Sequence, residues 1–100
     1  MKKRFIRGQL ILERGMSEDK MVVYERERDN ILSEILRWAT YRDVSLEFGL
    51  TTGDNYVCNY RIVAPNASSC RFVLSELKAR LKAVSGKKPE LGFETSGYCW

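Results

Sequence analysis

The chain has 100 residues, of which 44% are hydrophobic, 11% are aromatic and 30% are charged, and its net charge is +4. This composition excludes a disordered chain, and the length predicts one domain over residues 1–100 whose core needs neither disulfides nor a structural metal. Histidine is absent, so Ser-His and Cys-His catalysis are excluded within this chain.

The N-terminal segment predicts a strand over residues 4–13. Ile6, Leu10 and Leu12 share one parity with Gly8, as expected for a strand with one buried face. Two further apolar residues on the opposite parity blur this alternation. A strand that is partly covered on both faces would explain them.

The segment that follows is compatible with two structures. A cap at Ser17 and apolar residues spaced three and four apart predict one long helix that ends at about Tyr41. The β-branched pair Val22-Val23 favours instead an extra strand over residues 20–27, hairpinned to the first strand and followed by a shorter helix. Residues 31–41 are helical in both interpretations.

A β-hairpin is predicted next. Residues 43–49 alternate between apolar and polar side chains, and residues 51–55 supply typical turn residues. Residues 56–64 then resume as the second strand of the hairpin.

A second helix and a closing strand complete the chain. Asn66, Ser68 or Ser69 can cap the helix, and Ser85-Gly86 stops it. Its apolar stripe consists of Cys70, Val73, Leu74, Leu77, Leu81 and Val84. Residues 91–98 are predicted to form the last strand, at the edge of the sheet.

The order strand, helix, strand, strand, helix, strand predicts an α+β fold. We expect a two-layer sandwich of ferredoxin-like order, in which an antiparallel sheet carries both helices on one face. The other face of the sheet would be open. Residues 97–100 would then either close the core or project from the domain.

The sequence contains no recognisable catalytic, cofactor-binding or metal-binding motif. Glycines are dispersed and form neither a P-loop nor a G-x-G-x-x-G pattern, and no two of the three cysteines have C-x-x-C spacing. We therefore expect no cofactor and no enzymatic activity. A nuclease that uses Glu, Arg and Tyr without histidine is a remaining alternative.

The cysteines and the N-terminus suggest a compartment. Three cysteines cannot all pair within one chain, which favours reduced thiols. The basic residues of the first four positions are not followed by the apolar run of a signal peptide, and no other stretch approaches the length of a membrane span. We expect a soluble cytoplasmic protein.

These features favour a binding module with a protein partner. Residues 1–7 carry a net charge of +4 and residues 66–100 of +3, whereas residues 8–65 carry −3. We expect a small modulator or inhibitor, such as an accessory protein of a phage or mobile element, that docks on a larger cellular machine. The predicted docking surface combines aromatic residues near the C-terminus with basic residues near both ends, namely Phe93, Tyr98, Trp100, Lys2, Lys3, Arg4, Lys87 and Lys88.

A single-stranded nucleic-acid-binding domain is the alternative. The basic ends could follow a phosphate backbone, and Phe48, Tyr56 or Tyr60 could stack bases on the open face of the sheet. The same aromatic residues would also suit a hydrophobic core, because strand aromatics usually pack.

Overall fold

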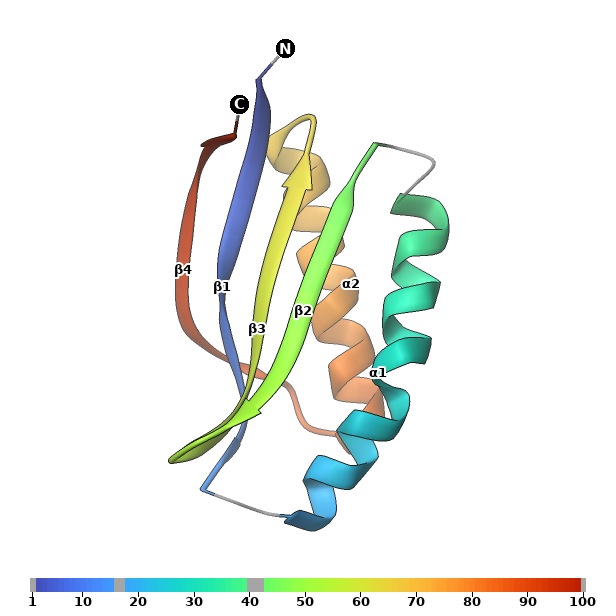
Figure 1. Ribbon diagram of the computed structural model, residues 1–100, viewed down its shortest axis with the longest axis vertical. Coiled ribbons are helices and arrows are strands. Elements are labelled where there is room, and N and C mark those ends of the chain that lie inside the picture. The colour runs from blue at the N-terminus through green and yellow to red at the C-terminus, as the bar shows by residue number, and fades with distance from the viewer. Residues whose placement is uncertain (1, 16–17, 40–42, 100) are drawn as a thin grey trace.

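The computed structural model describes residues 2–15, 18–39 and 43–99 (Figure 1). The elements follow in the predicted order: β1 (Lys3–Arg14), α1 (Glu18–Ala39), β2 (Ser45–Thr52), β3 (Asn55–Ala64), α2 (Ala67–Ser85) and β4 (Glu90–Cys99). The α+β class and this order are thus confirmed. The expected helix cap at Ser17 and the helix end at Tyr41 lie outside the described residues, as does Trp100.

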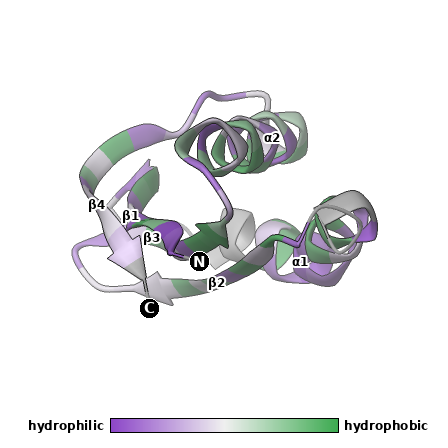
Figure 2. Cartoon of the chain, turned by 90° about the horizontal axis from the view of Figure 1, so that it is seen from above, coloured by the Kyte–Doolittle hydropathy of each residue, from purple (hydrophilic) through white to green (hydrophobic). Residues whose placement is uncertain are grey.

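The four strands form one antiparallel sheet with the order β2-β3-β1-β4. β1 lies inside the sheet, where Ile6 pairs with Ile62 and Leu10 with Cys58 of β3. β2 and β4 are the two edges, as predicted for the last strand. Both helices lie on the same side of the sheet, and its other face is open (Figure 2).

Residues 20–27 belong to α1, so the alternative interpretation with an extra strand is wrong. The side chains of Tyr24, Ile31 and Ile35 are buried against the sheet at helical spacing. This apolar stripe outweighs the strand propensity of Val22 and Val23, because propensity differences are small compared with the burial of large side chains.

The hydrophobic core fills the space between the sheet and the helices. Strand residues of one parity face it, and α2 contributes five buried residues of the predicted stripe, Cys70, Val73, Leu74, Leu77 and Leu81. The sixth, Val84, is partly buried and packs against this core. Ile6, Leu10 and Leu12 of β1 are buried there, which confirms the predicted alternation. The core side of the sheet is therefore determined by the period-two pattern of the strands.

Specific caps determine where α2 begins and ends. The Asn66 side chain accepts a hydrogen bond of 2.8 Å from the backbone N–H of Ser69, which selects Asn66 among the three predicted caps. Gly86 has a left-handed φ of 75°, and its N–H donates to the Lys82 carbonyl at 2.6 Å. This turn directs the chain towards β4.

Candidate interaction surface

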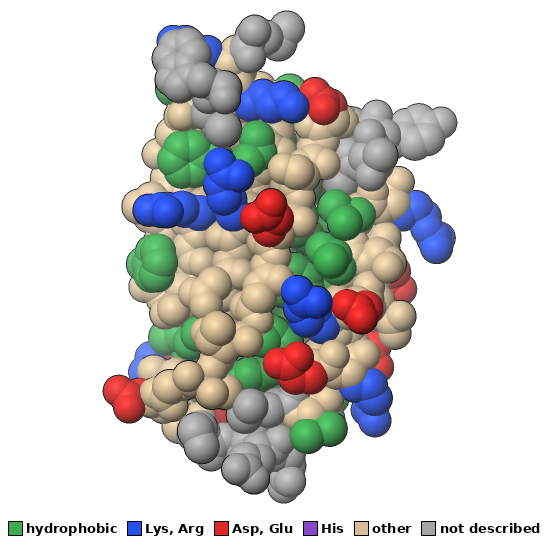
Figure 3. Space-filling model, in the orientation of Figure 1, with side chains coloured by type: hydrophobic (Ala, Val, Ile, Leu, Met, Phe, Trp, Pro, Cys, Tyr) green, Lys and Arg blue, Asp and Glu red, His purple; other side chains and the backbone are tan. Residues whose placement is uncertain are grey.

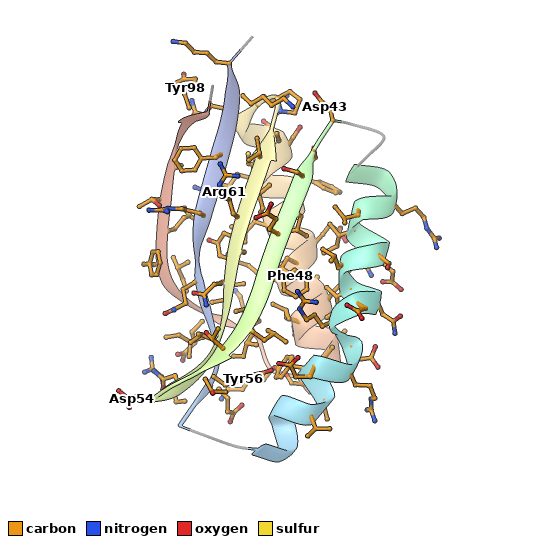
Figure 4. The ribbon with its side chains drawn as sticks, in the orientation of Figure 1. Asp43, Phe48, Asp54, Tyr56, Arg61 and Tyr98 are labelled. Atoms are coloured by element: carbon orange, nitrogen blue, oxygen red, sulfur yellow. The ribbon has the colours of Figure 1, made fainter. Side chains whose placement is uncertain are left out.

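The aromatic residues of the hairpin are part of the core. Phe48, Tyr56 and Tyr60 are all buried, and their register places them on the helix-covered side of the sheet (Figure 4). Tyr24 and Tyr56 pack together with ring centroids 5.6 Å apart. These rings are therefore not available to stack bases on the open face.

The open face of the sheet is mixed in character (Figure 3). Gln9 donates a hydrogen bond of 3.1 Å to Asn59, which donates one of 3.0 Å to Thr51, so the central part of this face is a polar row across three strands. Next to this row lies an open hollow of about 420 Å³ whose lining includes Arg7 and Arg61. Glu47 and Asn59 also line the hollow.

One end of the sheet combines a tyrosine with cations. The guanidinium carbon of Arg4 lies 4.5 Å from the centroid of the Tyr98 ring, and Lys2 Nζ lies 5.5 Å from it. We call Lys2, Arg4 and Tyr98 the Tyr98 cluster. The antiparallel pairing of β1 with β4 brings these residues together, because Arg4 is directly opposite Tyr98.

Lys3 belongs to the same end of the sheet but has its own partner. Its Nζ lies 3.3 Å from a carboxylate oxygen of Asp43, where the chain enters β2. Both side chains are largely exposed, so this ion pair contributes little to stability. The predicted cationic residues Lys2, Lys3 and Arg4 therefore lie together but differ in their contacts.

Among the side chains of edge strand β4 that the structure describes, three are apolar and exposed. Leu91, Phe93 and Tyr98 have exposed fractions of 56%, 52% and 58%. Phe93 pairs with Gln9 and faces the open side, whereas Leu91 pairs with Leu10. Gly92 between them forms a bulge, because the register with β1 shifts at this point.

Lys87 and Lys88 lie at the opposite end of β4. They precede Glu90, and a ten-residue strand extends over about 33 Å. Lys87 Nζ is 4.0 Å from a carboxylate oxygen of Glu13. The structure therefore divides the seven predicted docking residues that it describes, Trp100 lying outside them. Tyr98 and the N-terminal cations lie at one end of β4, Phe93 lies along the strand, and the two lysines lie at the other end.

The sequence interpretation did not include Leu91 in this surface. Leu91 was predicted only as the first residue of the closing edge strand, and its side chain is 56% exposed there. The neighbouring Gly92 was the available signal, because glycine within a strand often marks a bulge. The exposed apolar side chains are therefore distributed along β4, with Phe93 on the open face and with Leu91 and Tyr98 on the other face.

The buried thiols are poorly suited to chemistry. Burial raises the pKa of Cys58 to about 12, and burial also raises the pKa of Cys70. A thiol that stays protonated at neutral pH is a weak nucleophile. Among residues 2–15, 18–39 and 43–99, no three potential metal ligands of the His, Cys, Asp or Glu type form a group.

Comparison with known proteins gives no family for the chain. No protein-family model matches it, and no curated protein matches its sequence. Within the described residues, neither helix is long and apolar enough to cross a membrane. The geometry of the described residues is therefore the basis for a function.

Proposed function

We propose that the protein is a non-enzymatic binding module that docks on another protein through β4 and the Tyr98 cluster and alters the activity of that partner. The arrangement of its elements is that of the ferredoxin-like sandwich, in which both helices cover one face and leave the β4 edge accessible. The observation that carries the proposal is the row of exposed Leu91, Phe93 and Tyr98 on one edge strand.

An edge strand with exposed apolar side chains is a natural docking element. It offers backbone N–H and C=O groups to an added strand, while alternate side chains provide specificity. Soluble proteins usually protect such edges with charged or short strands. On β4 the charged residues Glu90 and Glu94 are instead each bound to an arginine of the same chain.

The Tyr98 cluster adds charge selectivity to this edge. Lys2 and Arg4 place two cations around an exposed aromatic ring. Tyrosine and arginine are enriched among the residues that dominate binding energy at protein interfaces. The partner that fits this surface is a protein with an acidic patch beside a strand or extended segment. We propose that this partner is a larger cytoplasmic machine, which includes the machines that process nucleic acid.

Capture of a partner from the native cell tests this proposal. We expect the wild-type protein to retain a partner that Phe93→Ser and Tyr98→Ser lose, because each variant removes an exposed side chain. The matched controls are Val22→Ser and Phe72→Ser, which change exposed apolar side chains on the helices. Equal capture by all four variants, with unchanged circular dichroism, would contradict docking through β4.

Point variants are better suited to this test than removal of residues 97–100. Gly97 and Tyr98 pair with Phe5 and Arg4 of β1. A deletion would therefore remove part of the sheet together with the docking side chains. Loss of binding by the deletion would not separate the two effects.

Binding of single-stranded nucleic acid is the second candidate. The observation that favours it is that Lys2 and Arg4 flank an exposed ring, since cations and aromatic rings together bind backbone and bases. In a titration with a single-stranded oligonucleotide, affinity should fall steeply with salt and should weaken in Tyr98→Ser. Absence of binding at low salt would eliminate this candidate.

A further inference from the structure

We infer that a second copy of the chain pairs with β4 in the free protein, forming an antiparallel strand pair with its two-fold axis at Thr95. This inference rests on the proposed function, because it concerns the same exposed strand. It identifies what covers the strand before the docking partner arrives. Self-pairing and docking would then compete for one surface.

The positions of the glycines and aromatic residues in β4 suggest this register. In a two-fold pair centred on Thr95, residues equally distant from Thr95 face one another. Phe93 then faces Gly97 of the second copy, and Tyr98 faces its Gly92. Each exposed aromatic side chain of β4 is thus placed opposite a residue that has no side chain.

Neighbouring registers lose this match. Centring the pair on Glu94 would place Tyr98 opposite Glu90, and centring it on Ser96 would place Tyr98 opposite Glu94. Both carboxylates already bind arginines of their own chain. The register centred on Thr95 instead places Glu94 opposite Ser96, so no two acidic residues of the strands oppose each other.

The open face provides an apolar contact at Gly97. A Cβ added to Gly97 would lie 3.0 Å from Cε1 of Phe5, which shows that the Phe5 ring leans over this glycine. Phe93 of the second copy would approach Gly97 from the other side and meet that ring. Aromatic pairs of this kind stabilise neighbouring strands and cover an edge glycine.

The apolar side chains on the helix side of the sheet also match in this register. Tyr98 shares the helix-side parity of Leu91 through their pairing with Arg4 and Leu10, so Tyr98 of one copy comes next to Leu91 of the other. Antiparallel pairing also brings the end with Lys2 and Arg4 towards the end that carries Lys87 and Lys88, so these charges weaken the pair rather than strengthen it. All three exposed apolar side chains of β4 are covered in this arrangement.

The two edge strands of the sheet differ in the polarity of their exposed side chains, and only β4 has exposed large apolar side chains. On β2 the exposed side chains are polar, namely Ser45, Glu47, Thr51 and Thr52. The outer edge of β4 is not flanked by either described helix, and α1 lies on the β2 side (Figures 1 and 2). A single pair of strands buries less area than the roughly 1,200 Å² of a stable interface, so we expect a weak, concentration-dependent dimer.

Charges introduced on the two-fold axis provide a specific test. Thr95 faces itself only in the proposed register, so Thr95→Glu places two carboxylates opposite each other, and Thr95→Lys places two ammonium groups there. In sedimentation velocity from about 1 µM to about 1 mM, the wild type should dimerise, and each variant alone should remain monomeric. An equimolar mixture of the two variants should restore the dimer, because opposite charges then face each other.

The matched controls are Ser45→Glu and Ser45→Lys on β2, which should dimerise like the wild type. Phe93→Ser provides a second disruption and should weaken association at least about tenfold, because its side chain is half exposed in the monomer. A monomeric wild type at the highest concentration would overturn the inference, as would a mixture that does not associate. This experiment contains only copies of the chain, so a negative result rejects self-pairing alone. Docking on a different protein is tested separately, by the capture experiment.

Discussion

Arg71 of α2 and Glu94 of β4 form a bidentate ion pair, with nitrogen–oxygen distances of 2.9 and 2.7 Å. The same carboxylate accepts a 3.5 Å hydrogen bond from the hydroxyl of Tyr60 on β3. The hydrogen bond to Glu94 raises the pKa of Arg71. This ion pair therefore connects β4, the last strand of the sheet, to helix α2.

A double-mutant cycle on this pair should show a modest coupling. Arg71 is 58% exposed and Glu94 is 20% exposed, so we expect a coupling free energy of about 0.5–1 kcal/mol. Glu94→Ala should be more destabilising than Arg71→Ala, because it also removes the partner of Tyr60. Urea unfolding measures both effects, and additive single variants would contradict the coupling.

Gly8→Ala should destabilise the protein strongly. A Cβ at this position would lie 2.2 Å from the carbonyl oxygen of Phe93 and 2.7 Å from the hydroxyl of Tyr60. The first of these atoms belongs to the backbone of the neighbouring strand, so β4 would have to move. We expect a loss of at least about 2 kcal/mol in the free energy of unfolding.

Gly49→Ala is the control for this prediction. Gly49 also lies in a strand, but an added Cβ would have no neighbouring atom within 4 Å. Its free energy of unfolding should change by less than about 1 kcal/mol. Equal effects of the two substitutions would show that strand propensity, rather than the close approach at Gly8, determines the result.

Alkaline pH should destabilise the fold. Burial, followed by the negative charges of nearby carboxylates, raises the pKa values of Tyr56 and Tyr60 from 10.0 to about 12, and burial raises that of Cys58 from 9.0 to about 12. The unfolded chain releases these protons at lower pH than the folded protein. The contribution of these three groups to the free energy of unfolding is therefore fully present below about pH 9 and is lost as the pH rises towards 12.

Urea unfolding between pH 8 and pH 11 measures this decrease. Cys58→Ala should reduce the part of the loss that begins near pH 9, because the buried thiol is removed. A free energy of unfolding that does not change over this range would contradict the burial of these groups.

Thiol labelling should report on opening of the core. In a Cys99→Ser variant, the remaining thiols are Cys58 and Cys70, which are both buried. The Cys70 thiol also donates a 3.5 Å hydrogen bond to the carbonyl of Arg4. Both thiols should react with a disulfide reagent only after unfolding, so their labelling rates should rise with urea, and rapid labelling of the native protein would contradict this.

The elements with one consistent period were predictable from the sequence. The stripe of α2 and the hairpin of β2 and β3 each follow a single pattern, and both form as expected. Residues 20–27 were ambiguous because Val22-Val23 favours a strand locally, whereas the burial of Tyr24 depends on a sheet that forms elsewhere in the chain. Tertiary packing therefore determines that these residues form a helix and not a strand.

The surface was predictable only in part. Phe93 and Tyr98 are exposed, and their part in a docking surface stays a prediction. The separation of Lys87 and Lys88 from Tyr98 follows from the direction of β4, because residues near each other in the sequence become distant along an extended strand. The contact of Arg4 with Tyr98 depends on strand register, which a local pattern does not specify.

The position of β1 inside the sheet has a consequence for how the protein is made. Its two neighbours come from residues 55–64 and 90–99, so nearly all its pairing is with segments synthesised much later. Such non-local pairing slows folding, and a nascent chain that still lacks β4 leaves one edge of β1 unpaired. β1 therefore completes its pairing on both sides only after β3 and β4 have been synthesised.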